Sequence, residues 1–439
     1  MFARRALWYV AFLLGIPMCV QVSGQTSPQR LKLPFAGIRQ EDLLPADGEE
    51  FSFFGSSLAI SGNTVVVGSP GYADSSGDAA PGHVYVYVKP SGGWTNMIQT
   101  AELSASDGGS DPGNNFGTSV AIAGDTIFVG APATLLGPFP NRVYIFSKPP
   151  DGWHDMTETA IVSAGVSPAA YGFGESVAVD DTGETLAVGA EYSQLNLPAP
   201  QGAVYVFVKP IGGWQDTSTP NALLTASDAA VNDRLGRSVA VDGNVVVAGA
   251  DDKFNGTGEI YLYVEPPQGW TNMTETAQLT AATPVASSFL GTSVAISGDT
   301  VVAGAPMGSR SVPTGRIYIF MQPPGGWHNT NETAQLIDPS RTFDYLGWSV
   351  ATTGRIVVAG APFANVQQNQ GQGAAYVYAK PKDGWKSASK FAALLDDKFG
   401  EVFDGFGTAV AIDNNTVTSG APDYPAGGNV GRAYVFTGR

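Results

Sequence analysis

Acidic residues recur in pairs and short groups along this 439-residue chain, and they are its main candidates for chemistry. These candidates are Asp107 and Asp111, Asp251 and Asp252, and the group Asp396, Asp397, Glu401 and Asp404. Carboxylate oxygens are the ligands that calcium prefers, and pairs of carboxyl groups hydrolyse glycosidic bonds by acid–base chemistry. The sequence therefore admits a cation-assisted binding face and, as an alternative, a polysaccharide hydrolase or lyase.

A structural role competes for residues of the same types. Asp, Asn or Ser stands three residues before a recurring glycine at Ser52, Asn114, Asp233, Ser288, Asp344 and Asp404. Such side chains commonly hydrogen-bond the backbone of their own loop. We therefore favour turn chemistry at these positions and take the cluster from Asp396 to Asp404 as the best remaining binding candidate.

Signatures of catalysis are otherwise missing from the sequence. It has three histidines, of which His154 and His328 occupy equivalent places directly after a tryptophan. No nucleophile elbow, zinc-ligand spacing or phosphate loop is found. The sequence therefore favours a binding protein over an enzyme. We assign no catalytic residue, metal ligand or cofactor, and calcium is the one cation considered.

A motif of about seventeen residues recurs seven times and organises the chain. One copy reads FGTSVAIAGDTIFVGAP (116–132), and in six copies a Gly-Ala or Gly-Ser pair begins thirteen residues after the first glycine. The third copy is longer by two residues. The seven motif glycines are Gly55, Gly117, Gly174, Gly236, Gly291, Gly347 and Gly407.

Each copy continues with an aromatic-valine segment such as VYVYVKP, and six copies then have a Gly-Trp turn and a leucine or valine segment. The tryptophans at nine residues from a tyrosine are Trp94, Trp153, Trp214, Trp270, Trp327 and Trp385. This fixed spacing predicts one packing role repeated six times rather than sugar stacking. Each full unit is predicted to contain four short strands, because β-branched and aromatic residues fill segments bounded by turns.

The two ends of the chain predict how these units close. An unattached EDLLPAD (41–47) resembles a fourth strand, while the seventh copy ends after its third strand at RAYVFTGR. We therefore predict an all-β fold, a seven-bladed β-propeller of four-stranded blades in which the N-terminal strand completes the last blade and hides the sheet edges. Trp348 replaces Ser or Thr after its motif glycine, and we expect it to fill space near the axis.

The repeated FG and GAP signatures resemble FG-GAP repeats, known from the propeller of integrin α subunits and from exported bacterial proteins. The resemblance covers about residues 41–439 and implies adhesion or protein binding without catalysis. Integrin-type repeats often carry a calcium loop between the first two strands, but the connections here are short, such as SGNT and AGDT. A tight hairpin cannot supply six to eight oxygen ligands. Only the third copy, with Asp180, Asp181 and Glu184, retains several carboxylates there.

The N-terminus predicts export. Arg4 and Arg5 precede an apolar run from Ala6 to Val20, which indicates a signal peptide (1–24) followed by a linker (25–40) and the propeller (41–439). The only cysteine, Cys19, lies within that run, so the mature chain has none. Removing the two arginines changes the net charge from −16 to −18, which disfavours nucleic acid and anionic membranes.

We therefore expect a secreted or extracytoplasmic, bacterial, monomeric protein that binds a protein or glycan ligand. The connections between strands two and three of a blade, and from strand four to the next blade, open on one rim of a propeller. These are the connections that vary in length and composition among the copies. Variable loops on a rigid ring form a binding surface, so we place function there.

Overall fold

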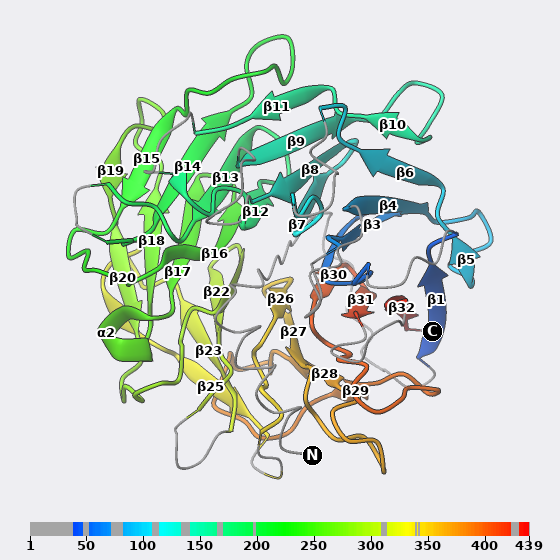
Figure 1. The fold of residues 1–439 in the computed structure, drawn as a ribbon. Coiled ribbons are helices and arrows are strands. Elements are labelled where there is room, and N and C mark those ends of the chain that lie inside the picture. The colour runs from blue at the N-terminus through cyan, green and yellow to red at the C-terminus, as the bar shows by residue number, and fades with distance from the viewer. Residues whose placement is uncertain are drawn as a thin grey trace.

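The computed structural model describes residues 38–46, 52–71, 82–107, 114–132, 141–164, 170–195, 199–308, 314–338, 340, 343–422 and 430–438. The predicted signal peptide, with Cys19, and most of the linker lie outside the described residues. Seven small antiparallel sheets are arranged around one axis and form a seven-bladed β-propeller (Figure 1). The fold prediction is confirmed. Blades are numbered here in the order of their first strands.

The first strand of each blade lies innermost, and the first strands of neighbouring blades contact one another all the way round the ring. These strands are β2 (Ser57–Ser61), β7 (Ser119–Ala123), β12 (Ser176–Val179), β16 (Leu235–Asp242), β21 (Ser293–Ser297), β26 (Val350–Thr352) and β30 (Val410–Asp413). A Cβ on Gly249 would lie 1.9 Å from the carbonyl oxygen of Gly291 in the next blade. Blades converge so closely here that only glycine fits.

A serine two residues after the motif glycine joins neighbouring blades. In blades 1 to 6 its hydroxyl donates to the carbonyl oxygen of the next motif glycine, as Ser293 does to Gly347 at 2.9 Å. Blade 7 has Ala409 at this position. The junction between blades 7 and 1 is therefore the one at which this side chain has no hydroxyl.

The second and third strands form the buried middle of each blade. The second strands are β3 (Thr64–Ser69), β8 (Thr126–Ala131), β13 (Thr185–Ala190), β17 (Val245–Ala250), β22 (Thr300–Ala305), β27 (Ile356–Ala361) and β31 (Thr416–Ala421). The third strands are β4 (His83–Val88), β9 (Arg142–Ser147), β14 (Ala203–Val208), β18 (Glu259–Val264), β23 (Arg316–Met321), β28 (Ala374–Ala379) and β32 (Arg432–Thr437).

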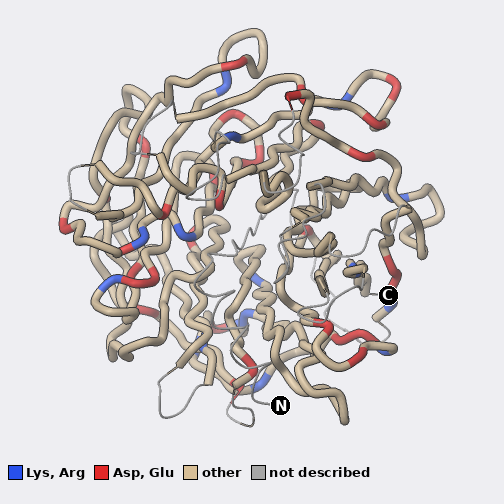
Figure 2. The backbone as a smooth tube through the Cα atoms, viewed as in Figure 1, with Lys and Arg blue, Asp and Glu red and all other residues tan. Residues whose placement is uncertain are grey.

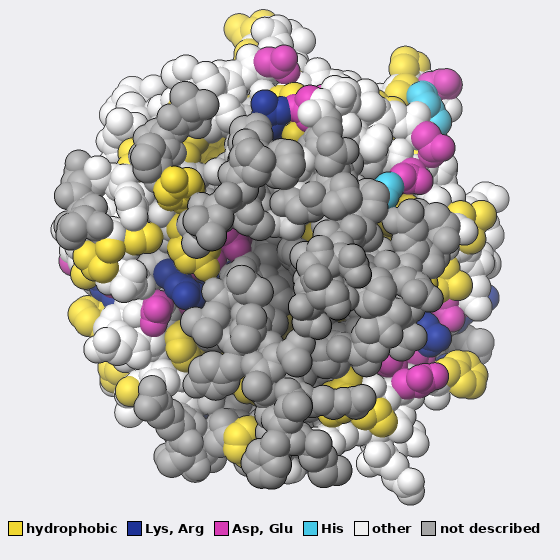
Figure 3. Space-filling view, in the orientation of Figure 1, with side chains coloured by type: hydrophobic (Ala, Val, Ile, Leu, Met, Phe, Trp, Pro, Cys, Tyr) yellow, Lys and Arg dark blue, Asp and Glu magenta, His cyan; other side chains and the backbone are white. Residues whose placement is uncertain are grey.

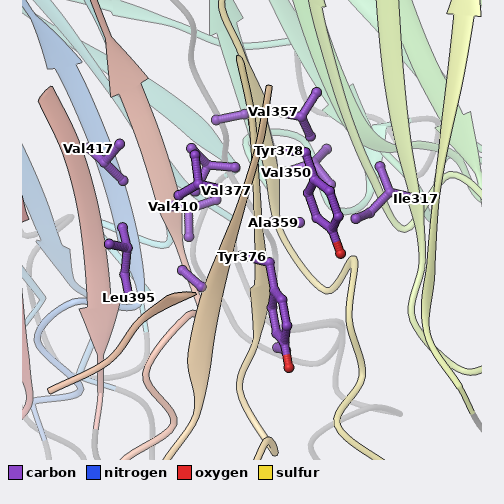
Figure 4. Close-up of a cluster of buried hydrophobic side chains, with 14 of the residues drawn as sticks. Ile317, Val350, Val357, Ala359, Tyr376, Val377, Tyr378, Leu395, Val410 and Val417 are labelled. Carbon is purple, nitrogen blue, oxygen red and sulfur yellow. The ribbon is translucent and has the colours of Figure 1, made fainter. Parts of the chain in front are cut away.

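Both faces of these strands pack against neighbouring blades. In blade 6, Tyr376 and Tyr378 lie on the side of Ile317 from blade 5, while Val377 lies on the side of Val410 from blade 7 (Figure 4). The side chains alternate because successive residues of a strand point to opposite faces. This explains why the third strands are almost uniformly apolar or aromatic, as expected for sheets covered on both sides.

The fourth strands form the outer part of the blades, and one of them closes the ring. They are β6 (Ala101–Ser104), β11 (Ala160–Val162), β15 (Ala222–Thr225), β20 (Ala277–Thr280), β25 (Ala334–Ile337), β29 (Ala393–Leu395) and β1 (Arg39–Leu44). The N-terminal strand β1 pairs antiparallel with the C-terminal strand β32, with Leu43 opposite Ala433. The predicted closure is confirmed, and the strand starts two residues earlier than expected.

A segment after each Gly-Trp turn pairs with the outer edge of the preceding blade, and we call this segment the clasp. Four clasps form two-residue parallel strands, β5 (Met97–Ile98), β10 (Met156–Thr157), β19 (Met273–Thr274) and β24 (Thr330–Asn331). Two other clasps, at Thr217 and at Ala388, each make one parallel bridge to the preceding blade. Four of the seven sheets therefore gain a fifth strand from their neighbour.

Each clasp is fixed by its tryptophan and by the side chain two residues later. Five of the six tryptophans are 3–7% exposed, and the half-buried Trp214 packs edge-on against Phe128 of the preceding blade. The side chain at the second position accepts from a backbone N–H of the preceding fourth strand, as Asn272 does from Leu223 at 2.9 Å. The same bond is made by Asn96, Asp155, Asp216, Asn329 and Ser387.

The described residues include one short helical turn, α2 (Lys253–Gly256), in the connection between the second and third strands of blade 4. In the part of the chain that the structure describes, no helix has the length and apolar character needed to cross a membrane.

Candidate functional site

The variable connections lie together on one side of the ring, which we call the upper rim. Backbone hydrogen bonds join connections of the two kinds, from Phe289 N to Gly256 O at 2.8 Å and from Phe403 N to Gln370 O at 3.0 Å. At these two places the two kinds of connection lie side by side on the upper rim, as the order of strands in a blade predicts.

Two of the predicted binding residues, Asp107 and Asp397, each connect the end of one blade to the third strand of the next blade. Asp107 accepts a hydrogen bond from the Tyr144 hydroxyl at 2.9 Å and forms an ion pair with Arg142. Asp397 is buried and accepts from Tyr434 at 2.8 Å and from Gln40 at 3.0 Å. The same aspartate–tyrosine bond recurs at Asp228 with Tyr261 and at Asp338 with Tyr376. These carboxylates already have partners within the protein.

The remaining members of the Asp396 to Asp404 group differ in exposure. Asp404 accepts a hydrogen bond from the backbone N–H of Glu401, and burial raises the pKa of the Asp404 carboxyl. Asp396 is partly exposed and Glu401 is fully on the surface. Asp111 lies outside the described residues. Of this group, Glu401 is best placed to meet a ligand, and its binding role stays a prediction.

Asp251 and Asp252 belong to a compact ionic group at the junction of blades 3 and 4. We call it the blade 3–4 charge cluster, and it consists of Glu175, Glu191, Arg234, Arg237, Asp251 and Asp252. Figure 2 shows basic and acidic positions close together in this part of the ring, around β16 and β17. The structure thus brings the two predicted aspartates together with four charged residues that the sequence interpretation had not singled out.

Two arginines hold the cluster together. The buried Arg237 donates from Nη1 to Glu191 Oε1 at 3.1 Å, and its Nε lies 3.6 Å from Asp251 Oδ2. Arg234 reaches Glu191 at 4.0 Å and Asp252 at 3.7 Å, and its guanidinium lies over the ring of Tyr192. Four carboxyl groups thus face two guanidinium groups, and this excess of negative charge favours protonation of some of the carboxyls.

The pKa shifts agree with this imbalance. Burial, and then the neighbouring Glu191, raise the pKa of Glu175 well above its ordinary value. Burial raises the pKa of Asp251 to about 6, although Arg237 and Arg234 oppose the shift. Desolvation disfavours a charge more strongly than these partners stabilise it. Burial and the neighbouring Glu191 therefore both favour the protonated form of Glu175, in which its acid group can donate to Glu191.

A second group of charges lies beside the cluster in blade 4. The Lys253 ammonium, on α2, donates to Asp233 at 3.0 Å and forms an ion pair with Asp228 at 3.1 Å. Burial, and then Asp228, raise the pKa of Glu259 to about 7. Asp233 also accepts from the backbone N–H of Ala230 at 2.7 Å, which is the loop-closing role predicted for that position.

The sequence did contain a signal for the cluster, in the way that two copies depart from the repeat. The position after the motif glycine is Ser or Thr in four copies, but Glu175 in blade 3 and Arg237 in blade 4. The position after Gly-Ala or Gly-Ser is proline in five copies, but Glu191 and Asp251 in the same two blades. Four departures from the repeat, in two adjacent copies, therefore indicate the site from the sequence alone.

Blade 6 departs from the repeat through an aromatic residue. Trp348 is 8% exposed and packs with Tyr345 and Phe363, with ring centroids 6.2 Å away in both cases. The ring centroids of Tyr345 and Phe363 lie 4.6 Å apart. Trp348 therefore fills space beneath the upper rim, and two partly exposed rings cover it.

Bulky residues in left-handed backbone conformations are concentrated on the upper rim. Of the thirteen described non-glycine residues with positive φ, twelve lie in its loops, and six of those are Phe or Tyr. The position two before the motif glycine is left-handed in every blade, with Phe53, Asn115, Gly172, Arg234, Phe289, Tyr345 and Gly405. Glycine would remove the strain, yet only two blades use it, so the larger side chains are kept at a cost.

Metal-binding groups are not found among the described residues, in the sense of three or more His, Cys, Asp or Glu side chains that could share an ion. In the longer third turn, Asp180 accepts from the backbone N–H groups of Glu184 and Thr185 at 2.8 and 2.9 Å. This carboxylate closes its turn. Calcium binding there remains untested.

The fold and this rim define a rigid ring scaffold that presents loops on one side. The FG-GAP repeat family matches residues 38–87, 97–146, 219–263, 273–320 and 332–378, more than half of the chain. The chain belongs to the FG-GAP repeat family, as its signatures indicated. The unmatched stretches include most of blades 3 and 7, which the repeat count and the structure supply. Comparison with curated proteins finds no match.

Proposed function

We propose that this chain is an exported, non-catalytic binding or adhesion propeller that recognises a protein or glycan through its upper rim. The strained aromatic residues of the rim carry this proposal. Holding a Phe or Tyr in the left-handed region costs roughly 1–3 kcal/mol per residue, and such strain persists mainly where function requires it.

The distribution of exposed apolar side chains supports the same surface. Six of the ten large hydrophobic residues exposed in the described regions lie in the upper-rim connections, namely Tyr171, Val231, Phe254, Phe343, Phe399 and Val402. In the described part of the face in Figure 3, hydrophobic side chains lie beside charged and other polar groups. Separate anchors with polar surroundings are typical of recognition rather than of a permanent subunit interface.

Binding screens with matched variants test the proposal. The mature chain is screened against glycan arrays and cell-surface proteins, and the variant F254S/F343S/F399S is compared with I98S/I211S, whose changes lie on clasps or Gly-Trp turns. We expect the rim variant to lose at least about tenfold in affinity, a loss expected for interface anchors, while the control keeps its affinity. Equal affinity of both variants for every ligand found would contradict the proposal.

A second candidate is a polysaccharide hydrolase or lyase, and the neighbouring carboxyl groups of Glu175 and Glu191 favour it. A carboxyl group with a raised pKa beside a carboxylate is the usual arrangement of an acid and a base. The low exposure of both side chains, 5% and 0%, weighs against contact with a substrate. Polysaccharide turnover that disappears in E175Q would establish the enzyme. A calcium titration of the melting temperature tests for a cation on the rim.

A further inference from the structure

Three loops at blade 6 are hydrogen-bonded into one surface on the upper rim. The described residues 343–346 of the first loop are joined to the loop at 362–373 by a bond from Phe363 N to Asp344 O at 3.3 Å. The second loop is joined to the loop at 396–406 by bonds from Asn369 Nδ2 to Gly400 O and from Gln372 Nε2 to Asp397 O, both 2.6 Å. We call the exposed surface of these loops the blade 6 shelf.

The shelf carries both exposed and packed aromatic side chains. Phe343 is 63% exposed and Phe399 is 81% exposed. On the same loops, the rings of Tyr345 and Phe363 cover Trp348. Phe343 has φ 63°, so its backbone is held in a conformation that a bulky residue rarely adopts. The exposed rings are therefore presented from a rigid support.

Neutral amides are exposed on the middle loop of the same shelf. Gln367, Gln368 and Gln370 are exposed on the middle loop, and Gln367 is also left-handed, with φ 52°. The fully exposed charges of the described part of the shelf are Lys398 and Glu401, which are of opposite sign. An amide offers both donors and acceptors, whereas an aromatic ring offers an apolar face. The shelf thus combines flat apolar faces with uncharged hydrogen-bonding groups.

From this combination we propose that the blade 6 shelf binds a neutral glycan, a proposal that rests on the proposed function and names its ligand class. Sugar rings present C–H faces that stack on Phe343 and Phe399, and hydroxyl groups that exchange hydrogen bonds with the glutamine amides. An anionic polysaccharide would need a surplus of cationic groups, whereas the exposed charges of the described part of the shelf, Lys398 and Glu401, balance each other. A protein partner would need a larger continuous apolar centre than these separate rings provide.

The test measures binding of the mature chain to uncharged β-glucan, xylan and mannan oligosaccharides, with alginate and heparin fragments as anionic comparisons. Variants F343A, F399A and Q368A are compared with I211A, which alters a fully exposed side chain on a Gly-Trp turn away from the upper rim. F254A, at a rim position in blade 4, tests whether the ligand binds another part of the rim. All five side chains are on the surface, so folding is preserved, and melting temperatures verify this. We expect a neutral oligosaccharide to bind, F343A and F399A to weaken its binding at least about tenfold, F254A to weaken it less than they do, I211A to leave it within about twofold, and salt to have little effect.

Several results would overturn the proposal while keeping the proposed function. These are a ligand that is a protein or an anionic glycan, and a neutral glycan whose binding is lost in F254A but kept in F343A and F399A. If no rim substitution changes the binding of any ligand, the proposed function fails together with this inference.

Discussion

At the scale of single residues, the unusual feature of this protein is the number of carboxyl groups whose pKa values are raised by burial. Glu175, Asp251, Asp252 and Glu259 all have raised pKa values, and burial is the largest cause for each. They lie in blades 3 and 4, beside only three described cations, Arg234, Arg237 and Lys253. Buried charges destabilise a fold unless they are well compensated. We therefore expect the stability of this region to depend on pH.

The pH dependence of stability follows from the direction of these shifts. An acid whose pKa is higher in the folded than in the unfolded chain binds more protons when folded, so stability falls as pH rises between the two values. We therefore expect the melting temperature to be higher at pH 5.5 than at pH 7.5. In E175Q the neutral amide keeps a donor toward Glu191 and removes one titrating group, so the difference between the two pH values should shrink.

The exposed Glu184 provides the control for this experiment. E184Q changes the same atoms on a surface turn, and the melting temperatures of this variant should follow the parent at every pH. A pH slope in E175Q as steep as in the parent would mean that Glu175 is charged in the folded protein, and the assignment of the shared proton would be wrong.

At the scale of elements, the clasp explains why the Gly-Trp turn is repeated at a fixed spacing. Its tryptophan packs between two blades, and its Asn, Asp or Ser caps a backbone N–H of the preceding fourth strand. Each blade therefore protects the outer edge of its neighbour rather than its own edge. Edges covered in this way are not available for pairing with other chains.

Substitution of one clasp tests this division of roles. W270A removes a ring that is 6% exposed, and we expect it to cost about 3–5 kcal/mol of unfolding free energy. Hydrogen exchange should speed up most in β15, which belongs to blade 3 and pairs with this clasp. The control I211A alters a fully exposed side chain in another Gly-Trp turn and should change neither quantity. Faster exchange confined to β20, in blade 4 itself, would contradict the clasp.

The elements were predictable from sequence to different degrees. Seven copies of one motif and the unattached strand before Gly55 were sufficient to predict the ring and its closure, because each repeat encodes the same four strands. The roles of Asp397 and Asp251 were not predictable from composition. Asp397 accepts a hydrogen bond from Tyr434, which lies 37 residues further along the chain. Asp251 forms an ion pair with Arg237 on the neighbouring strand, and this contact depends on how the two strands pack within the blade. Aligning the copies against one another would have revealed Glu175 and Glu191.

At the scale of the whole molecule, the ring has one junction unlike the others. Blades 1 to 6 each donate a serine hydroxyl to the next motif glycine, whereas Ala409 of blade 7 faces Gly55 of blade 1 without one. The same junction is where the two ends of the chain meet, since β1 pairs with β32 in blade 7. This seam lacks the side-chain hydrogen bond that the other six junctions share, so we expect the stability of the whole propeller to depend on it.

Adding the missing hydroxyl tests that view. A409S should place an oxygen where the other six blades have one and donate to Gly55 O, and a buried hydrogen bond contributes about 1 kcal/mol. We expect a higher melting temperature and slower unfolding in denaturant. S293A, which removes the equivalent bond from an interior junction, should lower stability by a similar amount.

A411S is the matched control, because alanine stands at this position in all seven copies and Ala411 packs in the same apolar cluster as Ala409. A hydroxyl there gains no equivalent acceptor and should destabilise by about 1–3 kcal/mol. If A409S and A411S destabilise the protein equally, the seam does not offer the geometry of the other six junctions, and opening of the ring must start elsewhere.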